Sequence, residues 1–363
     1  MKTRKTLFAS FAFLFLGLVP ILAMGQSMPH TFTANTAAKA SEVNENFTYL
    51  LERFGGIRET TVNCGTSGTG SGINSAIQNG YNSIVINGVC KENITLDGTG
   101  SYGAKGNTLR LLKLRGANND ASQDKIIDNS SYTEHVLKFN YGDMLVTIDN
   151  LTISGGDRAI TAWSNINLSI KNSKVEGYKN RGINLSGGSI LDAENLTIDG
   201  SYSGATTDEV GLQLWGKSVA WFENLTITNN QKYGLTTYNS VIDVNGNITL
   251  TGNGRAINVG GAATFSSDAN ITISGSTDRA INVAQGLFKS NNTTITNTPG
   301  NTFHAWMSNI KINNLTATGD GSTEESLVVI NQSSSIFETL NISNSGKNGI
   351  ESDSAIIYVD NLT

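Results

Sequence analysis

The sequence has little proline, few aromatic residues and few charges. Its 363 residues include 3 Pro, 7% aromatic residues and 15% charged residues, against 39 Gly, and Asn, Ser and Thr occur throughout. This composition is not that of a helical enzyme, because such chains are rich in Ala, Leu, Glu and Lys. The length is nevertheless sufficient for a large buried core.

Long apolar runs are absent except at the N-terminus. The chain begins with Lys2, Arg4 and Lys5, continues with an apolar run at 7–22 and then has small residues around Ala23. This order is typical of a secretory signal peptide. We therefore expect residues 1–25 to be a cleaved bacterial signal and the protein to be secreted or displayed on the cell surface. The alternative is a membrane anchor, but the run is short for one, and no second long run follows to span a membrane in the mature chain.

A surplus of positive charge is also absent. The formal net charge is −5, and removal of the three N-terminal cations makes it −8. A mildly acidic surface argues against nucleic acid as a partner, since phosphate backbones are bound by basic surfaces.

Cysteine is nearly absent, and the two that occur are Cys64 and Cys90. In the oxidising environment of a secreted protein, a single pair favours a disulfide over a metal site or a catalytic thiol. We therefore predict a Cys64–Cys90 disulfide, no metal site and no cofactor.

What the sequence does contain is a repeat. The phrase Asn-(Leu/Ile/Thr)-Thr-(Ile/Leu) recurs from residue 93 onward, and successive copies after Asn150 are mostly 22 or 23 residues apart. A nearly constant period means one structural unit per repeat. The copies, weaker ones included, start at Asn93, Asn150, Asn172, Asn195, Asn224, Asn247, Asn270, Asn292, Asn314, Asn341 and Asn361.

Each repeat contains three segments in which apolar residues alternate with polar ones, as in strands. One precedes the Asn, as in Val146/Ile148; one follows it, where Leu and Ile flank an outward Thr; the third is the phrase RAINV, found at 255–259 and 279–283. Three short strands cannot close a core alone, but stacked coils can. We therefore predict an all-β parallel β-helix over residues 60–363.

The recurring Asn has two interpretations. Asn-x-Ser/Thr is the acceptor pattern for glycosylation. Asn also tolerates the left-handed backbone conformation at a bend, and identical amides in register can hydrogen-bond from coil to coil. The placement of the Asn at one corner of every coil favours the ladder.

The run LLKLRGANNDASQDKIIDNSSYTEHVLKFNYGDMLVTIDNLTISGGDRAITAWSN at 111–165 resembles the opening coils of right-handed parallel β-helix proteins of the pectate-lyase-like superfamily, and the resemblance extends over 60–363. It implies a right-handed helix with three sheets and an internal Asn ladder. The superfamily includes lyases, hydrolases, phage tailspikes and non-catalytic surface proteins, so the resemblance implies no single activity.

Both ends of the predicted solenoid carry distinct features. We expect residues 26–59 to be an N-terminal helical segment, because Val43, Phe47 and Leu50 within 28–54 would share one face of an amphipathic helix. That face would cover the first coil or pair with a second copy in a homo-oligomer. A second short helix is expected at 71–78. The chain stops within a strand, which predicts an uncapped or truncated last coil.

The outward positions of the RAINV strands combine amides and hydroxyls with aromatic rings. A sugar chain needs hydrogen-bonding groups for its hydroxyls and a flat apolar surface for its C–H faces. The alternative is that these residues only cover a solvated sheet. The predicted contacts with a polysaccharide or cell-surface glycan are Trp163, Asn184, Gln213, Trp215, Thr236, Tyr238, Asn258 and Asn282.

A basic residue precedes four of these strands. Guanidinium groups could hold the carboxylates or sulfates of an acidic polysaccharide, or they could tie turns to acidic neighbours such as Asp157 and Asp278. The four residues are Arg158, Arg181, Arg255 and Arg279. We expect His304 to point inward or to mark a register shift, since it falls where other coils place Ile or Leu.

These patterns predict a secreted or surface β-helix that binds extended polysaccharide along the RAINV sheet, without an identifiable catalytic centre. One alternative is a polysaccharide lyase acting by β-elimination, with an Arg beside a calcium-loaded acidic turn. Another is a structural stalk or adhesin assembled through 28–54.

Overall fold

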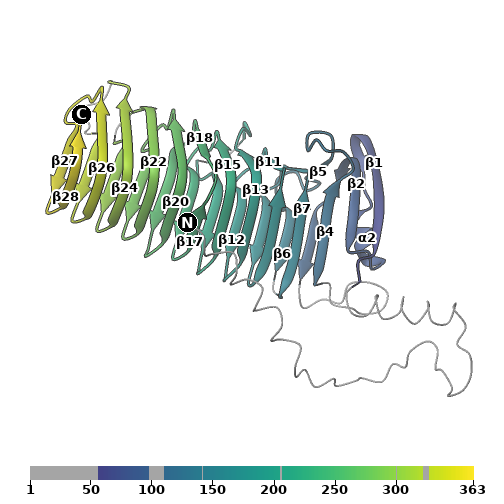
Figure 1. Ribbon diagram of the computed structural model, residues 1–363. Helices are drawn as coiled ribbons and strands as arrows, with labels where there is room; N and C mark the ends of the chain where they lie inside the picture. The colour runs from purple at the N-terminus through teal and green to yellow at the C-terminus, as the bar shows by residue number, and fades with distance from the viewer. Residues whose placement is uncertain (1–55, 98–109, 141, 205–206, 300, 322–326) are drawn as a thin grey trace, which may run out of the picture. The chain divides into compact units, whose positions relative to one another are not determined.

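The structure is a computed structural model that describes residues 56–97, 110–140, 142–204, 207–299, 301–321 and 327–363. Among these residues the chain is nearly all β, with strands stacked in successive coils from β1 and β2 at one end to β27 and β28 at the other (Figure 1). The predicted parallel β-helix is confirmed. The expected signal peptide and the 28–54 helix lie outside the described residues.

The RAINV segments form one parallel sheet, which we call sheet B. Each strand pairs with the equivalent strand one coil earlier and one coil later, so Ile257 pairs with Ile281. Its eleven described strands are β3 (Ile94–Asp97), β6 (His135–Asn140), β9 (Arg158–Trp163), β12 (Arg181–Ser186), β14 (Val210–Trp215), β16 (Tyr233–Tyr238), β19 (Arg255–Gly260), β21 (Ile281–Ala284), β23 (Phe303–Trp306), β25 (Val328–Asn331) and β27 (Ile350–Asp353).

The other two segments of each coil belong to a second parallel sheet, sheet A, with seventeen described strands. They are β1 (Glu59–Gly70), β2 (Ser83–Lys91), β4 (Leu111–Gly116), β5 (Lys125–Ile127), β7 (Met144–Asp149), β8 (Thr152–Ser154), β10 (Ile166–Lys171), β11 (Lys174–Glu176), β13 (Ile190–Asp199), β15 (Val219–Thr228), β17 (Val241–Val244), β18 (Ile248–Thr251), β20 (Thr264–Ser274), β22 (Leu287–Thr298), β24 (Asn309–Gly319), β26 (Ser334–Ser343) and β28 (Ile356–Leu362).

Sheet A bends at the recurring Asn, which divides each coil into two arms. We call the residues before this Asn the first arm and the residues from the Asn onward the second arm. Asn150, Asn172, Asn195 and Asn224 adopt positive φ values between 47° and 63° at the bend, a conformation that Asn tolerates better than most residues. The three predicted segments of a coil are therefore sheet B and the two arms of sheet A.

The core lies between these three walls. Inward side chains of sheet B form continuous columns, such as Leu235, Ile257 and Ile281, which pair in register and are fully buried. Phe265 and Phe288 stack with their ring centroids 4.9 Å apart. The predicted alternation of apolar residues thus correctly assigned the inward face.

The N-terminal end of the described solenoid carries the short helix α2 (Ile73–Gln78), close to the expected 71–78. The buried Glu92 carboxylate accepts the backbone N–H groups of Ile73 and Asn74 at 3.1 and 2.9 Å, which satisfies the first turn. The predicted disulfide is present and joins Cys64 in β1 to Cys90 in β2, with their Cα atoms 5.1 Å apart.

The recurring Asn forms a ladder, but the ladder is not internal. Leu225 and Ile227 point into the core, so Asn224, which alternates with them, points outward. The expectation of an internal ladder was wrong for this reason. The amide bonds run from Asn195 to Asn172 at 2.9 Å, Asn224 to Asn195 at 3.0 Å, Asn292 to Asn270 at 2.9 Å and Asn314 to Asn292 at 2.8 Å.

A second, buried ladder lies at the corner between the second arm and sheet B. The Asn230 amide donates to the Asn253 side-chain oxygen at 2.9 Å, and the Asn253 amide donates to the Ile227 carbonyl at 3.0 Å. The fully buried Tyr178 hydroxyl donates to the Asn230 side-chain oxygen at 2.5 Å. These bonds satisfy polar groups that would otherwise destabilise the core.

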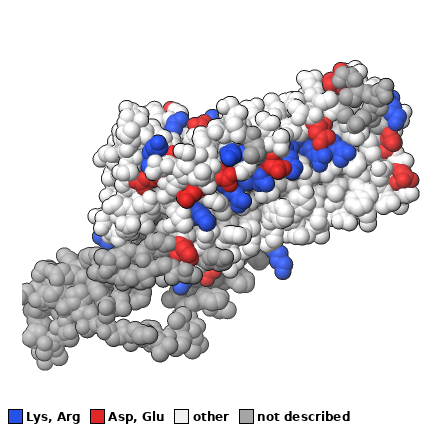
Figure 2. All heavy atoms as spheres, turned by 180° about the vertical axis from the view of Figure 1, so that it is seen from behind, with Lys and Arg blue, Asp and Glu red and all other residues white. Residues whose placement is uncertain are grey.

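Charged side chains concentrate in part of the surface. On the face seen in Figure 2, basic and acidic side chains intermix along a band that follows the stack of coils, and much of the remaining described surface is uncharged. That face therefore offers both signs of charge side by side.

Candidate functional site

The outward side of sheet B, which we call the sheet B face, brings the predicted polar residues into one column. The strand pairing places Thr161 beside Asn184, Gln213 beside Thr236, and Asn258 beside Asn282. We call this set the polar column: Lys138, Thr161, Asn184, Gln213, Thr236, Asn258, Asn282 and His304.

The prediction for His304 was wrong by one residue in register. Phe303 pairs with Ile281 and is fully buried, while His304 pairs with Asn282 in the polar column. The phrase FHAW places Phe303 and Ala305 in the core columns. Its alternate residues, His304 and Trp306, therefore point outward.

Much of the polar column is already hydrogen-bonded and buried. Thr236, Asn258 and Asn282 are buried, and amide bonds of 3.0 and 2.8 Å link them in sequence. At the ends of the column, His135 Nδ1 lies 2.7 Å from the Thr161 hydroxyl and His304 Nδ1 lies 3.0 Å from Asn282 Oδ1. These groups stiffen the face. The half-buried Asn184 and Gln213 are more accessible.

Indole rings form an exposed column beside the polar one. Register places Trp163, Trp215 and Trp306 in the same column of sheet B, where 47%, 48% and 41% of each residue is exposed. We call this set the aromatic column: Trp163, Ser186, Trp215, Tyr238, Gly260, Ala284 and Trp306. Sequence reasoning missed Trp306 as a site residue because it assigned FHAW to the wrong register.

Tyr238 is fixed within the aromatic column. Its ring lies 5.2 Å from the Trp215 ring, centroid to centroid, and its hydroxyl accepts from the Asn258 amide at 2.9 Å. A Cβ at Gly260 would lie 2.4 Å from the Tyr238 ring, so only glycine allows the ring to lie flat along the sheet at that point. The ring is thus part of the platform rather than a free side chain.

The predicted basic column is discontinuous. Arg158 pairs with Arg181, but Val210 and Tyr233 occupy the next two positions before Arg255. Each of the four arginines lies near a polar group of the protein, although Arg158 Nε makes no hydrogen bond among the described residues. Arg158 lies 3.7 Å from Asp157 and Arg255 lies 2.5 Å from Asp278; Arg181 donates to Gln213 at 3.0 Å and Arg279 donates to Asn282 at 3.2 Å.

The two histidines of the sheet B face are neutral at pH 7. Burial, together with the charge of Arg158, lowers the pKa of His135 to about 4. Burial likewise lowers the pKa of His304 to about 4, with Arg279 contributing. Each imidazole therefore binds its hydroxyl or amide neighbour without carrying a charge.

A buried carboxyl group lies near the start of β14. The Glu209 side chain is inaccessible to solvent and accepts the Gln231 backbone N–H at 3.1 Å. Burial, with a smaller contribution from the charge of Asp199, raises its pKa to about 8. Glu209 is therefore largely protonated at pH 7, and its Oε1 atom has no hydrogen-bond partner among the described residues.

The described residues lack both a cluster of metal ligands and a membrane-spanning helix. No group of three or more His, Cys, Asp or Glu side chains in that part of the chain could hold a metal ion. No helix within it has the length and apolarity needed to cross a membrane.

Comparisons with known proteins give a distant structural similarity. No family model matches the chain, and no curated protein matches it. Among solved structures, the Agl-KA catalytic domain is 15% identical with a TM-score of 0.37, over 80% of this chain and 64% of that one. The catalytic domain of a GH87 alpha-1,3-glucanase in complex with tetrasaccharides is 14% identical with a TM-score of 0.40, over 84% and 68%. Similarity this low transfers no activity.

Proposed function

We propose that the sheet B face binds an extended polysaccharide, with the aromatic column as its stacking platform. The observation that carries the proposal is that Trp163, Trp215 and Trp306 lie in one column, each more than 40% exposed. Exposed indole surface is unfavourable in water, and aromatic rings bind the apolar faces of sugars by burying that surface.

The spacing of the rings suits a polymer better than a small molecule. Trp163 and Trp215 are two coils apart, about 10 Å, and Trp215 and Trp306 are four coils apart, about 19 Å, at ~4.8 Å per coil. A ligand that contacts all three rings must be long and follow the coil axis. Asn184 and Gln213, beside the first two rings, can hydrogen-bond its hydroxyl groups.

The four arginines differ in how far their charge is compensated. Arg158 and Arg255 lie beside Asp157 and Asp278, so an acidic group on the ligand would compete with a carboxylate there. Arg181 and Arg279 hydrogen-bond to the neutral amides of Gln213 and Asn282 and can still attract an acidic group. We therefore expect binding of an acidic polysaccharide to weaken with added salt and binding of a neutral one to depend little on it.

The chain offers a matched control for the binding test. Trp221 lies in the first arm of sheet A and is 39% exposed, so it resembles the other three indoles but faces another side. On a carbohydrate array, and in pull-downs with insoluble polysaccharides, Trp215→Ala should weaken binding at least about tenfold, which is about 1.4 kcal/mol. Trp221→Ala should bind as the wild type does.

Two results would contradict the proposal. One is equal binding by wild type and the Trp215→Ala/Trp306→Ala double variant; the other is an equal loss in Trp221→Ala. The lyase alternative has a separate readout: incubation with uronic-acid polymers and calcium, followed by ultraviolet absorbance of unsaturated products. A rise in absorbance would show that binding alone is an incomplete description.

A further inference from the structure

The second arm of sheet A carries a regular array of outward hydroxyl groups. In five successive coils the sequence there reads Asn-x-Thr-x-Thr or Asn-x-Thr-x-Ser. We call these residues the hydroxyl array: Asn224, Thr226, Thr228; Asn247, Thr249, Thr251; Asn270, Thr272, Ser274; Asn292, Thr294, Thr296; and Asn314, Thr316, Thr318.

Strand pairing aligns the array in two directions. Thr226, Thr249, Thr272, Thr294 and Thr316 pair in sequence from coil to coil, and Thr228, Thr251, Ser274, Thr296 and Thr318 do the same. The register shifts in β20, β22 and β24 lie outside these runs. Four intervals of ~4.8 Å separate the first strand from the fifth, and four intervals of ~3.3 Å separate the Asn from the last hydroxyl residue of each strand, so the array covers about 19 by 13 Å.

The array is rigid. Its inward neighbours, such as Leu225, Ile227 and Leu250, are buried in the core columns, and the Asn ladder fixes one edge. Threonine is branched at Cβ, so its side chain has few rotamers to lose. Because the array is already ordered, little conformational entropy of the protein is lost when a ligand binds to it.

Strand propensity alone does not explain the array. Threonine favours strands in general, yet the first arm of the same strands carries a mixture at its outward positions: Trp221 and Glu223 in β15, Asp268 in β20, Lys289 in β22 and Lys311 in β24. Both arms share backbone, sheet and exposure to solvent. In these five coils, only the second arm is uniform and free of charge.

The hydroxyl groups of the middle column have little to bind within the protein. Among the described residues, no side-chain hydrogen bond joins Thr226, Thr249, Thr272 or Thr294 to another residue, and Thr316 only accepts one from Asn341, at 3.5 Å. The outer column is partly self-paired, as in Thr251 and Ser274 at 3.3 Å. A column of hydroxyls that donates to no neighbour must satisfy its hydrogen bonds with water.

We propose that the hydroxyl array binds the surface of an ice crystal. The hydroxyls repeat at ~4.8 Å from coil to coil and, because they occupy alternate residues, at ~6.6 Å along each strand. A rigid two-dimensional array with spacings of this order can place its hydroxyl groups where an ordered lattice of water molecules would place its oxygen atoms. Each hydroxyl group donates and accepts hydrogen bonds as a water molecule does. Each threonine methyl group lies between neighbouring hydroxyls and excludes mobile water from that space.

The absence of charge in the array favours an uncharged ligand such as ice. Ice has no net charge, and neither does the array. A lysine or glutamate would hold a hydration shell that does not fit the lattice. A polysaccharide would be better matched by rings, which the array lacks and the sheet B face has. The two proposed sites therefore face different sides of each coil and bind different ligands.

Thr272 is the central residue of the array, which makes it the sharpest test. Full-length chain should show thermal hysteresis and should partition into slowly growing ice, and Thr272→Lys should lose most of both effects. Thr264→Lys is the matched control, because Thr264 is an outward threonine of the same strand β20 but lies in the first arm. It should behave as the wild type does.

Several outcomes would overturn the proposal. The first is a wild-type hysteresis no larger than that of serum albumin at equal concentration. The second is an equal loss in Thr264→Lys and Thr272→Lys. The third is a loss in Trp215→Ala without a loss in Thr272→Lys, which would place the ice contact on sheet B. Circular dichroism confirms folding, and Thr294→Lys, one strand further, substitutes if Thr272→Lys does not fold.

Discussion

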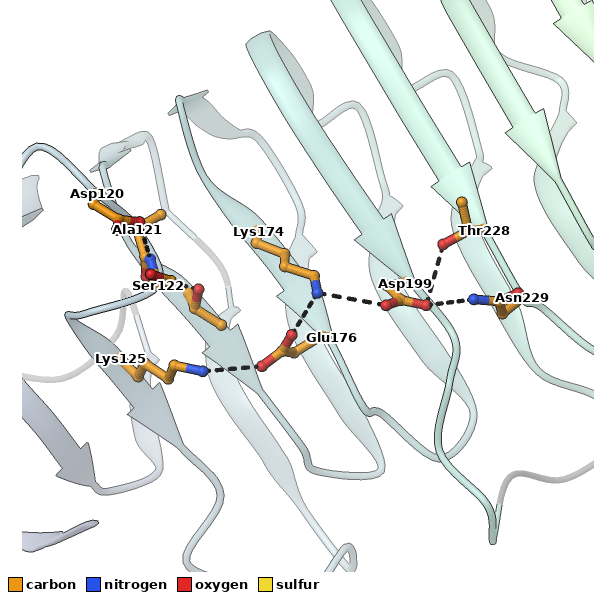
Figure 3. A network of polar contacts seen from close by, with 10 residues as sticks. Asp120, Ala121, Ser122, Lys125, Lys174, Glu176, Asp199, Thr228 and Asn229 are labelled. Carbon is orange, nitrogen blue, oxygen red and sulfur yellow. Dashed lines mark hydrogen bonds and ion pairs between the residues drawn. The ribbon is translucent and has the colours of Figure 1, made fainter. Parts of the chain in front are cut away.

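The second arm of sheet A has two halves that share a backbone and differ in their outward side chains. In the coils up to Asp199 the arm carries ion pairs: Lys174 lies 2.7 Å from Glu176 and 3.4 Å from Asp199, and Lys125 lies 3.4 Å from Glu176 (Figure 3). In the coils after Asp199 it carries the hydroxyl array. Strand pairing continues across the change, since Asp199 pairs with Thr228.

The polar side chains at the junction between the two halves are hydrogen-bonded to one another. The Thr228 hydroxyl and the Asn229 amide both donate to Asp199 Oδ1, at 3.1 and 2.9 Å (Figure 3). The coils therefore stack equally well with charges or with hydroxyls on the outside. We call the second arm up to Asp199 the charged half and the second arm from Asn224 to Thr318 the hydroxyl half. Because both halves stack in the same way, the inward residues determine the fold, and the outward residues can vary without changing it.

Within the hydroxyl half, substitution of an inward residue should lower stability far more than substitution of an outward residue, and this is the largest change that we predict. Leu250→Ala removes a fully buried side chain between Ile227 and Ile273 and should lower the free energy of unfolding by about 3 kcal/mol. Thr249→Ala, at the exposed neighbouring position, should change it by less than about 1 kcal/mol. Urea denaturation measures both; equal losses would contradict the separation of roles.

The second-largest change that we predict is the pH dependence of stability caused by Glu209. This residue follows the charged half and accepts a hydrogen bond from the Gln231 backbone N–H, just after the first strand of the hydroxyl half. Its pKa is about 8 in the fold against an ordinary 4.5, so the folded chain binds more protons than the unfolded chain between these pH values. Stability should therefore fall as pH rises from 4.5 to 8. Glu209→Gln should flatten this slope and stabilise the protein at pH 8 by on the order of 2 kcal/mol, as measured by urea denaturation across pH.

The smallest change that we predict compares a charged residue with a hydroxyl residue in the column that contains Glu176, Asp199, Thr228 and Thr251. Burial raises the pKa of Glu176, but hydrogen bonds and charges from Lys174 and Lys125 outweigh it and lower the pKa below its ordinary value. The pairs should therefore stabilise the fold at neutral pH and lose this effect as pH falls below the ordinary value and through the lowered one.

Glu176→Gln should cost about 1 kcal/mol at pH 7 and low salt, and less in high salt. Thr251→Val, further along the same column, should show no such salt dependence. Thermal unfolding at several salt concentrations compares the two variants, and a salt response of equal size in both would remove the distinction between the halves.

The sequence was sufficient for the fold because inward positions repeat strictly. Ile257 and Ile281 fall in equivalent phrases, and the structure pairs them. Outward assignments were harder, since a shift of one residue exchanges the two faces; this is how His304 was misplaced and Trp306 overlooked. The recurring Asn phrases contain every threonine of the middle column. The alignment of these threonines with the hydroxyl residue two positions later, as in Thr249 and Thr251, becomes visible only when the coils are in register.

The nearly constant coil length has an evolutionary consequence. Because each coil contributes one row to every face, duplication of a single coil between Trp215 and Trp306 would move those indoles one row further apart and add a row of hydroxyls on another side. Gene duplication could therefore change the reach of both surfaces in one step, without redesigning any contact in the core.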